Sequence, residues 1–144
     1  MKKAKLILII TLLLMTISMC NAQVINSSQL ANTVWINETE SGNSETLEFT
    51  KDSVRISSYY PRLKDTVKYS KPFYLSNNKN ESFDMKKVGT PTSGKYLLNW
   101  NMWMKGKEYC EITTLTEDSL VLFYEAKPNH IGAEDVYFTY KRIR

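Results

Sequence analysis

The sequence has little of the side-chain chemistry that enzymes use. Its 144 residues include one histidine, His130, and two cysteines, Cys20 and Cys110. Acid–base or metal chemistry needs several such groups together. His130 lies in a Pro-Asn-His-Ile-Gly turn, and Cys110 lies in the middle of a predicted strand, where a thiol packs as a small apolar group. A Cys110–His130 pair has no third partner, so we expect no catalytic residues, no metal site and no cofactor.

Long apolar runs are missing too, except for one near the N-terminus. Leu6–Met19 is uncharged, follows three lysines within the first five residues, and precedes the short segment Cys20–Ala22. It is shorter than the ~20 residues that a membrane-spanning helix needs. The pattern predicts a signal peptide over residues 1–22, cut before Gln23.

Export has two consequences for the remaining domain, residues 23–144. The domain keeps only Cys110, so no internal disulfide can form and packing must supply its stability. It is also long enough for one hydrophobic core. We expect a single exported domain in the periplasm or outside the cell.

Cys20 leaves a second interpretation of this segment open. Ile17–Cys20 is similar to a bacterial lipobox, in which the cysteine receives a lipid that holds the protein at a membrane. Lipoboxes place a small residue before the cysteine, whereas Met19 is bulky. Soluble export is therefore the favoured prediction, and we expect membrane contact only if Cys20 is lipidated.

The charge of the chain excludes another class of function. The formal net charge is +4, but three of its 19 basic residues lie in the predicted signal peptide. The exported domain is therefore close to neutral, and it lacks the basic stripe expected of a nucleic-acid-binding protein. We expect no nucleic-acid partner.

Apolar residues alternate with polar ones through most of residues 23–144, and helical periodicity is missing. One helical turn is expected at Ser27–Ala31, capped by a serine hydroxyl. The expected strands are Val34–Glu38, Thr46–Thr50, Ser53–Tyr59, Thr66–Leu75, Ser82–Val88, Lys95–Met104, Glu108–Leu115, Ser119–Lys127 and Glu134–Ile143. Eight or nine short strands without a crossover helix predict an all-β, antiparallel up-and-down barrel.

Two segments share one turn pattern. Phe49–Ser53 and Leu115–Ser119 both have the order apolar, Thr, charged, Asp, Ser. An aspartate in a turn accepts hydrogen bonds from the backbone amides that follow it. The pattern predicts two tight hairpins closed by Asp52 and Asp118.

Four segments carry a family resemblance: Leu30–Trp35, Leu47–Ser53, Ile112–Leu120 and Phe138–Ile143. Together they resemble the lipocalin-like (calycin) small barrels of bacterial exported proteins. Thr33 stands where that family has the glycine of its Gly-x-Trp motif. The resemblance implies a lipocalin-like barrel in which Arg142, or else Arg144, stacks on Trp35 as a cation–π pair that closes the bottom of the barrel.

The strongest predicted strand, Lys95–Met104, carries an apolar stripe on one face. The stripe consists of Tyr96, Leu98, Trp100, Met102 and Met104. Small barrels fill their interior with side chains or hold one small ligand, so two interpretations stay open: a plain core, or a pocket for a small apolar ligand. In the second, Tyr69 and Tyr124 add polar tips, and Trp100→Ala abolishes ligand uptake.

A protein partner is the alternative. Residues 59–65 begin with two tyrosines and include Arg62, residue types that are enriched at interfaces. Residues 89–96 form a second predicted exposed loop, in which Ser93–Tyr96 resembles a loop of small periplasmic lysozyme inhibitors. The sequence thus predicts a non-enzymatic exported binding protein, with a small apolar ligand in the barrel or a protein bound through these loops.

Overall fold

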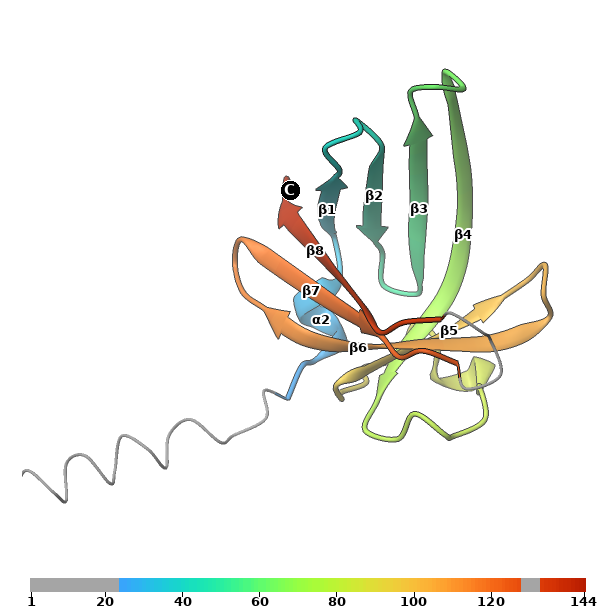
Figure 1. The fold of residues 1–144 in the computed structure, drawn as a ribbon. Helices are drawn as coiled ribbons and strands as arrows, with labels where there is room; N and C mark the ends of the chain where they lie inside the picture. The colour runs from blue at the N-terminus through green and yellow to red at the C-terminus, as the bar shows by residue number, and fades with distance from the viewer. Residues whose placement is uncertain (1–23, 128–132) are drawn as a thin grey trace, which may run out of the picture.

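The computed structural model describes residues 24–127 and 133–144, and these form a closed barrel of antiparallel strands (Figure 1). The strands are β1 (Thr33–Glu38), β2 (Ser44–Phe49), β3 (Ser53–Tyr60), β4 (Asp65–Ser76), β5 (Tyr96–Asn101), β6 (Gly106–Leu115), β7 (Ser119–Tyr124) and β8 (Val136–Arg142). Each strand pairs with the next along the chain, and β8 pairs with β1. The prediction of an all-β antiparallel barrel is confirmed.

The apolar residues that alternate along the strands meet inside the barrel. Successive side chains of a strand point to opposite faces, so every second residue reaches the interior. The largest fully buried side chains include Trp35, Tyr140, Phe49 and Phe73. The Phe49 and Phe73 rings pack edge to face, with their centroids 5.4 Å apart. These residues belong to one contiguous core at one end of the barrel, the closed end.

A short helix, α2 (Ser27–Leu30), covers the closed end and buries Leu30 completely. The turn begins at Asn26, whose backbone N–H donates to Gln29 Oε1 at 2.7 Å. The predicted serine cap is therefore wrong: Asn26 is the N-cap, and Gln29 accepts its amide. Among the described residues, no helix is long and apolar enough to cross a membrane.

The two turns that share a sequence pattern lie at this same end, and threonine closes both. The N–H of Ser53 donates to Thr50 Oγ1 at 3.0 Å, and the N–H of Ser119 donates to Thr116 Oγ1 at 3.0 Å. The hairpins are as predicted, but the expected role of aspartate is wrong. In each turn the threonine hydroxyl, and not the aspartate carboxylate, accepts the serine N–H. The Asp52 carboxylate instead accepts a hydrogen bond from the Thr50 hydroxyl at 2.8 Å.

The predicted strand at Ser82–Val88 is absent, which leaves eight strands. A 3₁₀ helix, η1 (Met85–Lys87), lies there instead, and Asp84 Oδ1 accepts the N–H of Lys86 at its start. Phe83 packs its ring against Tyr74 and Trp100, with centroids 5.1 and 5.8 Å away. The connection between β4 and β5 therefore covers the outer face of these two strands.

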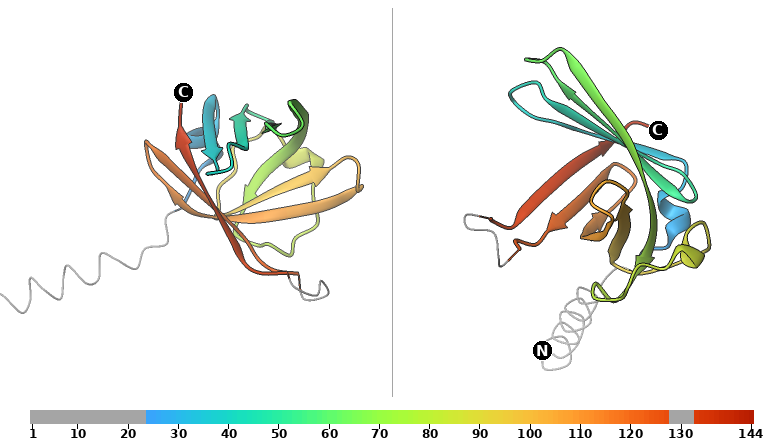
Figure 2. Two further views of the ribbon diagram at one scale, coloured as in Figure 1. Left: turned by 45° about the horizontal axis from the view of Figure 1, so that its top comes forward. Right: turned by 90° about the vertical axis from the view of Figure 1, so that its right-hand side faces the viewer.

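The barrel is closed at one end and splayed at the other. β4 pairs with β5 only over Phe73–Ser76, and β8 pairs with β1 only at Trp35 and Ile36. Within each half, β1–β4 and β5–β8, neighbouring strands pair over longer stretches, although β6 and β7 pair only between Glu111 and Leu115, with a shift of register. The two four-stranded halves therefore diverge away from α2 and leave an open end (Figure 2).

Candidate ligand-binding site

At the open end, polar side chains occupy the inward-facing strand positions. Glu45 is in phase with the core residue Leu47 on β2, Lys71 with Phe73 on β4, and Asn99 with Leu97 on β5. Since side chains alternate strictly between faces, these polar groups point into the barrel. The interior is thus apolar at the closed end and polar at the open end.

A pocket of about 350 Å³ lies at the open end between the two halves of the barrel, and we call it the mouth. Its volume is within the range of about 300–1,000 Å³ that is typical of small-molecule sites. The mouth is lined by Asn37, Thr39, Asn43, Ser44, Glu45, Ser58, Tyr59, Tyr60, Tyr69, Lys71, Tyr124, Phe138 and Tyr140. Six of these are aromatic, so the walls offer rings as well as hydrogen-bonding groups.

Glu45 is held in the mouth by two hydroxyl groups. Tyr140 Oη donates to Glu45 Oε1 at 2.6 Å, and Ser58 Oγ donates to Glu45 Oε2 at 3.1 Å. Within residues 24–127 and 133–144, Glu45 makes no ion pair with a lysine or arginine. Burial raises the pKa of Tyr140, and the neighbouring charge of Glu45 raises it further. Among the described residues, the Glu45 carboxylate is thus held by the neutral hydroxyl donors Tyr140 and Ser58.

Among the described residues, Lys71 is the one basic residue that lines the mouth, and its charge has a partner. Its ammonium group pairs with the carboxylate of Glu108 on β6, which also accepts a hydrogen bond from Asn101 Nδ2 at 2.8 Å. Burial opposes the charge of Glu108, but the bonds from Lys71 and Asn101 outweigh burial and hold the pKa of Glu108 below its usual value. Lys71 and Glu108 therefore neutralise each other.

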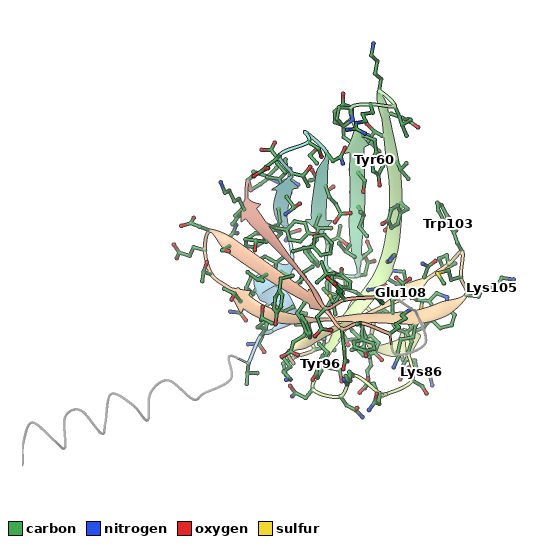
Figure 3. All side chains as sticks on the ribbon, viewed as in Figure 1. Tyr60, Lys86, Tyr96, Trp103, Lys105 and Glu108 are labelled. Atoms are coloured by element: carbon green, nitrogen blue, oxygen red, sulfur yellow. The ribbon has the colours of Figure 1, made fainter. Side chains whose placement is uncertain are left out.

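A side opening adjoins the mouth between β4 and the β5–β6 hairpin. This pocket of about 330 Å³ shares Tyr69 and Lys71 with the mouth and is also lined by Glu108 and Trp103. The Trp103 ring lies 5.9 Å from the Tyr69 ring, although its side chain is 78% exposed. Figure 3 shows Trp103 at the tip of the hairpin and Glu108 further inside. An exposed tryptophan thus stands at the rim.

Asn99 has a buried oxygen without a partner. The residue is 6% exposed, and among the described residues its Oδ1 is the buried side-chain oxygen or nitrogen that forms no hydrogen bond. Its cross-strand neighbours are Phe73 on β4 and Glu108 on β6, so it lies below the mouth. A buried acceptor that is left unpaired costs about 1–3 kcal/mol. The interior therefore holds an acceptor that a bound donor would satisfy.

Two of the residues predicted for the ligand site, Tyr69 and Tyr124, line the mouth. Burial raises the pKa of Tyr69, and the charges of Glu45 and Glu108 raise it further. Burial also raises the pKa of Tyr124 well above its usual value. Both tyrosines are therefore neutral hydroxyl groups that can donate or accept hydrogen bonds.

The predicted apolar stripe does not line the interior. Leu97 and Asn99 take the inward positions of β5, so Tyr96, Leu98 and Trp100 lie on the outer face. Leu98 is nonetheless fully buried, because the β4–β5 connection covers it. The expected face is wrong because both faces of β5 are buried, and alternation alone does not say which face points inward.

Met102 and Met104, the last two residues of the predicted stripe, lie in the turn that follows β5 and are exposed. β5 ends at Asn101, whose Oδ1 accepts the N–H groups of Trp103 and Met104, each at 3.0 Å. An asparagine side chain that bonds to the following backbone turns the chain. The predicted strand therefore extends three residues past the end of β5.

The expected contact between Trp35 and Arg142 is present. The two residues are cross-strand neighbours on β1 and β8, and the guanidinium carbon of Arg142 lies 5.6 Å from the centroid of the Trp35 ring. The indole Nε1–H donates to Thr33 Oγ1 at 2.7 Å. This pair lies where the first and last strands meet, at the closed end and away from the mouth.

The two loops expected to bind a protein differ in their surroundings. Tyr59 and Tyr60 line the mouth, and Leu63, at the tip of the β3–β4 hairpin, is exposed. Residues 89–96 are tied down instead: Thr92 O accepts from Ser27 N at 2.9 Å, and Gly94 N donates to a backbone oxygen at 2.9 Å. The second loop therefore has much less freedom than its sequence predicted.

The residues considered for catalysis are not assembled in the described part of the chain. Cys110 is buried in the core, and burial raises the pKa of its thiol to about 12, so the nucleophilic thiolate is scarce at neutral pH. His130 lies outside the described residues. Within residues 24–127 and 133–144 there is no group of His, Cys, Asp and Glu suited to a metal ion.

Sequence analysis missed most of the polar lining of the interior. The missed polar residues are Glu45, Ser58, Lys71, Asn99, Glu108 and Tyr140, and the aromatic residue Phe138 was missed as well. The sequence did contain a signal. On three strands a polar or charged residue lies two positions from a core residue and therefore on the same face of the strand. Reading that phase across neighbouring strands would have indicated a polar end of the barrel.

Comparison of the chain with family models, with curated proteins and with solved structures found no match. The class of protein therefore follows from the fold alone. It is an eight-stranded, closed antiparallel β-barrel with one packed end and one open end, an architecture compatible with a lipocalin-like barrel.

Proposed function

We propose that this protein is a non-enzymatic, lipocalin-like binding protein that holds a small organic molecule in the mouth of its barrel. The observation that carries the proposal is the change in the barrel interior from a packed apolar core to a pocket of about 350 Å³ lined by six aromatic rings and several polar groups. A barrel that needed only stability would continue its apolar packing. Pockets with aromatic walls and a few fixed polar groups are typical ligand sites.

The mouth also accounts for features that stability does not require. Asn99 leaves an acceptor unpaired below the pocket, and Trp103 stands exposed at the neighbouring opening. Buried unpaired acceptors are rare in folded proteins and destabilise them, so they point to a missing partner such as a ligand or an ordered water molecule. Asn99 does not line the mouth or the side opening, so the exposed ring of Trp103 is the feature that bears directly on a ligand, which would stack on it at the rim.

The uncharged fluorescent probe N-phenyl-1-naphthylamine tests this proposal, because its emission rises when it enters an apolar pocket. We expect saturable binding to the protein and about tenfold weaker binding to Tyr124→Ala, which removes a ring from the mouth. The matched control is Tyr137→Ala on the adjacent strand β8. Tyr137 stacks on Phe123, with ring centroids 4.7 Å apart, and does not line the mouth.

The control variant is expected to bind the probe within about twofold of the unmodified protein, since a surface change away from the site has little effect. Trp100→Ala is expected to do the same, because Trp100 lies on the outer face. Equal binding by all variants would mean that the probe attaches elsewhere, and no saturable binding would contradict a pocket in the mouth.

We also propose that the protein is exported, with residues 1–22 removed before Gln23. The basic, apolar and small-residue regions of this segment support the proposal. The intact mass of the protein purified from its own host is expected to equal that of residues 23–144. A mass that includes a covalent diacylglycerol on Cys20 would instead make the protein a membrane-anchored lipoprotein.

A further inference from the structure

The charges inside the barrel do not balance. Within residues 24–127 and 133–144, three ionisable side chains other than tyrosine lie at inward-facing strand positions beside the mouth: Glu45, Lys71 and Glu108. Lys71 and Glu108 form an ion pair, which leaves Glu45 with the neutral donors Tyr140 and Ser58. A carboxylate has about four acceptor positions, and two hydroxyl groups do not fill them. The mouth thus holds one negative charge and has acceptor capacity to spare.

The walls around this charge are rings. Tyr59, Tyr60, Tyr69, Tyr124, Phe138 and Tyr140 line the same pocket as Glu45. The face of an aromatic ring is negative, so several rings around a site attract a cation, above all one that is weakly hydrated. In this barrel, Lys71 already lies over the Tyr69 ring, with Nζ 5.5 Å from the centroid. The mouth therefore attracts positive charge both by its carboxylate and by its walls.

The charge of Glu45 also disfavours ionisation of the tyrosines around it. Burial raises the pKa of Tyr69, Tyr124 and Tyr140, and in each case the charge of Glu45 raises it further. The charge of Glu45 disfavours the negative, ionised form of each of these tyrosines. By the same interaction it favours a positively charged group in the pocket.

We propose that the ligand of the mouth is an organic cation, a primary amine or quaternary ammonium group attached to an apolar or aromatic body. Glu45 pairs with the cationic group, the rings of the mouth surround it, and the body of the ligand extends toward the rim. This inference rests on the proposed function of the mouth as a small-molecule site. It narrows the chemistry from the apolar ligand expected from the sequence to a positively charged one.

Three probes of similar shape and different charge test the proposal: 2-phenylethylamine, 2-phenylethanol and phenylacetate, each used to displace N-phenyl-1-naphthylamine. We expect the amine to bind about tenfold more tightly than the alcohol, and phenylacetate to bind most weakly. Added salt is expected to weaken the binding of the amine and to leave that of the alcohol unchanged.

Glu45→Gln removes the charge and keeps the shape and an oxygen that accepts from Tyr140. In this variant we expect the ratio of the amine's affinity to the alcohol's affinity to fall to about one, and this ratio is read independently of how tightly the fluorescent probe binds. Glu48→Gln is the matched control, because Glu48 lies on the same strand but faces outward and pairs with Arg144 at 2.9 Å. This control is expected to keep the preference for the amine.

The outcomes separate the two proposals. If the fluorescent probe binds but the amine has no advantage over the alcohol, the inference of a cationic ligand is wrong and the small-molecule site stands. A preference that survives in Glu45→Gln would equally overturn the role of Glu45. If neither the fluorescent probe nor any of the three ligands binds, the proposed function itself fails.

Discussion

Replacement of Gly94 by alanine is expected to destabilise the barrel by about 3 kcal/mol or more and to lower its melting temperature by about 10 °C or more. Gly94 has φ of +152°, and a Cβ there would lie 2.1 Å from the carbonyl carbon of Ser76 and 2.3 Å from its oxygen. Both atoms are backbone, so no side-chain rotation relieves the overlap. The β4–β5 connection or the end of β4 has to move.

A shift of the backbone at Gly94 affects other segments, because several of them meet there. The Gly94 N–H donates to Ile25 O at 2.9 Å, and the adjacent Ser93 pairs with Asn26 in an isolated bridge. A shift at Gly94 therefore disturbs the chain that leads into α2 and covers the closed end. Urea unfolding followed by circular dichroism measures the loss of stability.

Gly42→Ala is the matched control for this prediction. Gly42 also has a positive φ, +80°, but a Cβ there would meet only Pro61 Cγ, at 3.6 Å. This variant is expected to lose only about 1–2 kcal/mol of stability, which is the cost of placing a residue with a side chain in the left-handed conformation. Equal losses in the two variants would show that the close approach to Ser76 is not the cause.

The sequence predicted the framework of the barrel because alternation is a local property. β3 runs from Ser53 to Tyr60 against a predicted Ser53–Tyr59, and β6 and β7 begin within two residues of their predicted starts. Buried apolar residues recur at every second position of each of these strands, so period two reveals a strand without any knowledge of the fold. The contact of Arg142 with Trp35 followed from the family resemblance, since only the closed barrel brings the first and last strands together.

The parts that failed depend on distant contacts. Ser82–Val88 alternates like a strand, yet Phe83 packs on the outside of the barrel against residues of β4 and β5. The stripe on β5 looked like a core face because it is apolar, but it packs on the outside of the barrel, where the Phe83 ring of the β4–β5 connection lies 5.8 Å from the Trp100 ring. Tertiary packing on both faces of one strand removes the distinction on which the periodicity argument rests.

The mouth was missed for a related reason. Polar residues such as Glu45 and Lys71 are ordinarily assigned to the solvent face, and neither follows a recognisable motif. Their position inside the barrel is set by the phase of Leu47 and Phe73 further along the same strands. The phase is present in the sequence, but the splaying that makes room for these residues depends on how the two halves of the barrel meet.

Trp35→Ala is expected to destabilise the protein by about 3–5 kcal/mol, a large part of the stability of a domain of this size. Trp35 is fully buried in the core, and Leu47 on β2 is its cross-strand neighbour. Removal of the indole leaves a cavity at the seam where β1 and β8 pair at only two positions. Because β1 and β8 are joined by so few pairs, these strands cannot move inward to fill the cavity without breaking their pairing.

Two further variants decide which part of Trp35 matters. Trp35→Phe keeps a ring beneath Arg142 but removes the N–H that donates to Thr33 Oγ1, which in turn donates to Leu30 O of α2 at 2.5 Å. We expect it to lose less than half as much stability as Trp35→Ala. Trp103→Ala, the control, is expected to change stability by no more than about 0.5 kcal/mol, because Trp103 is exposed. Thermal unfolding followed by circular dichroism compares the three, and a tolerated Trp35→Ala would mean that the seam is held by backbone pairing instead of by the buried indole.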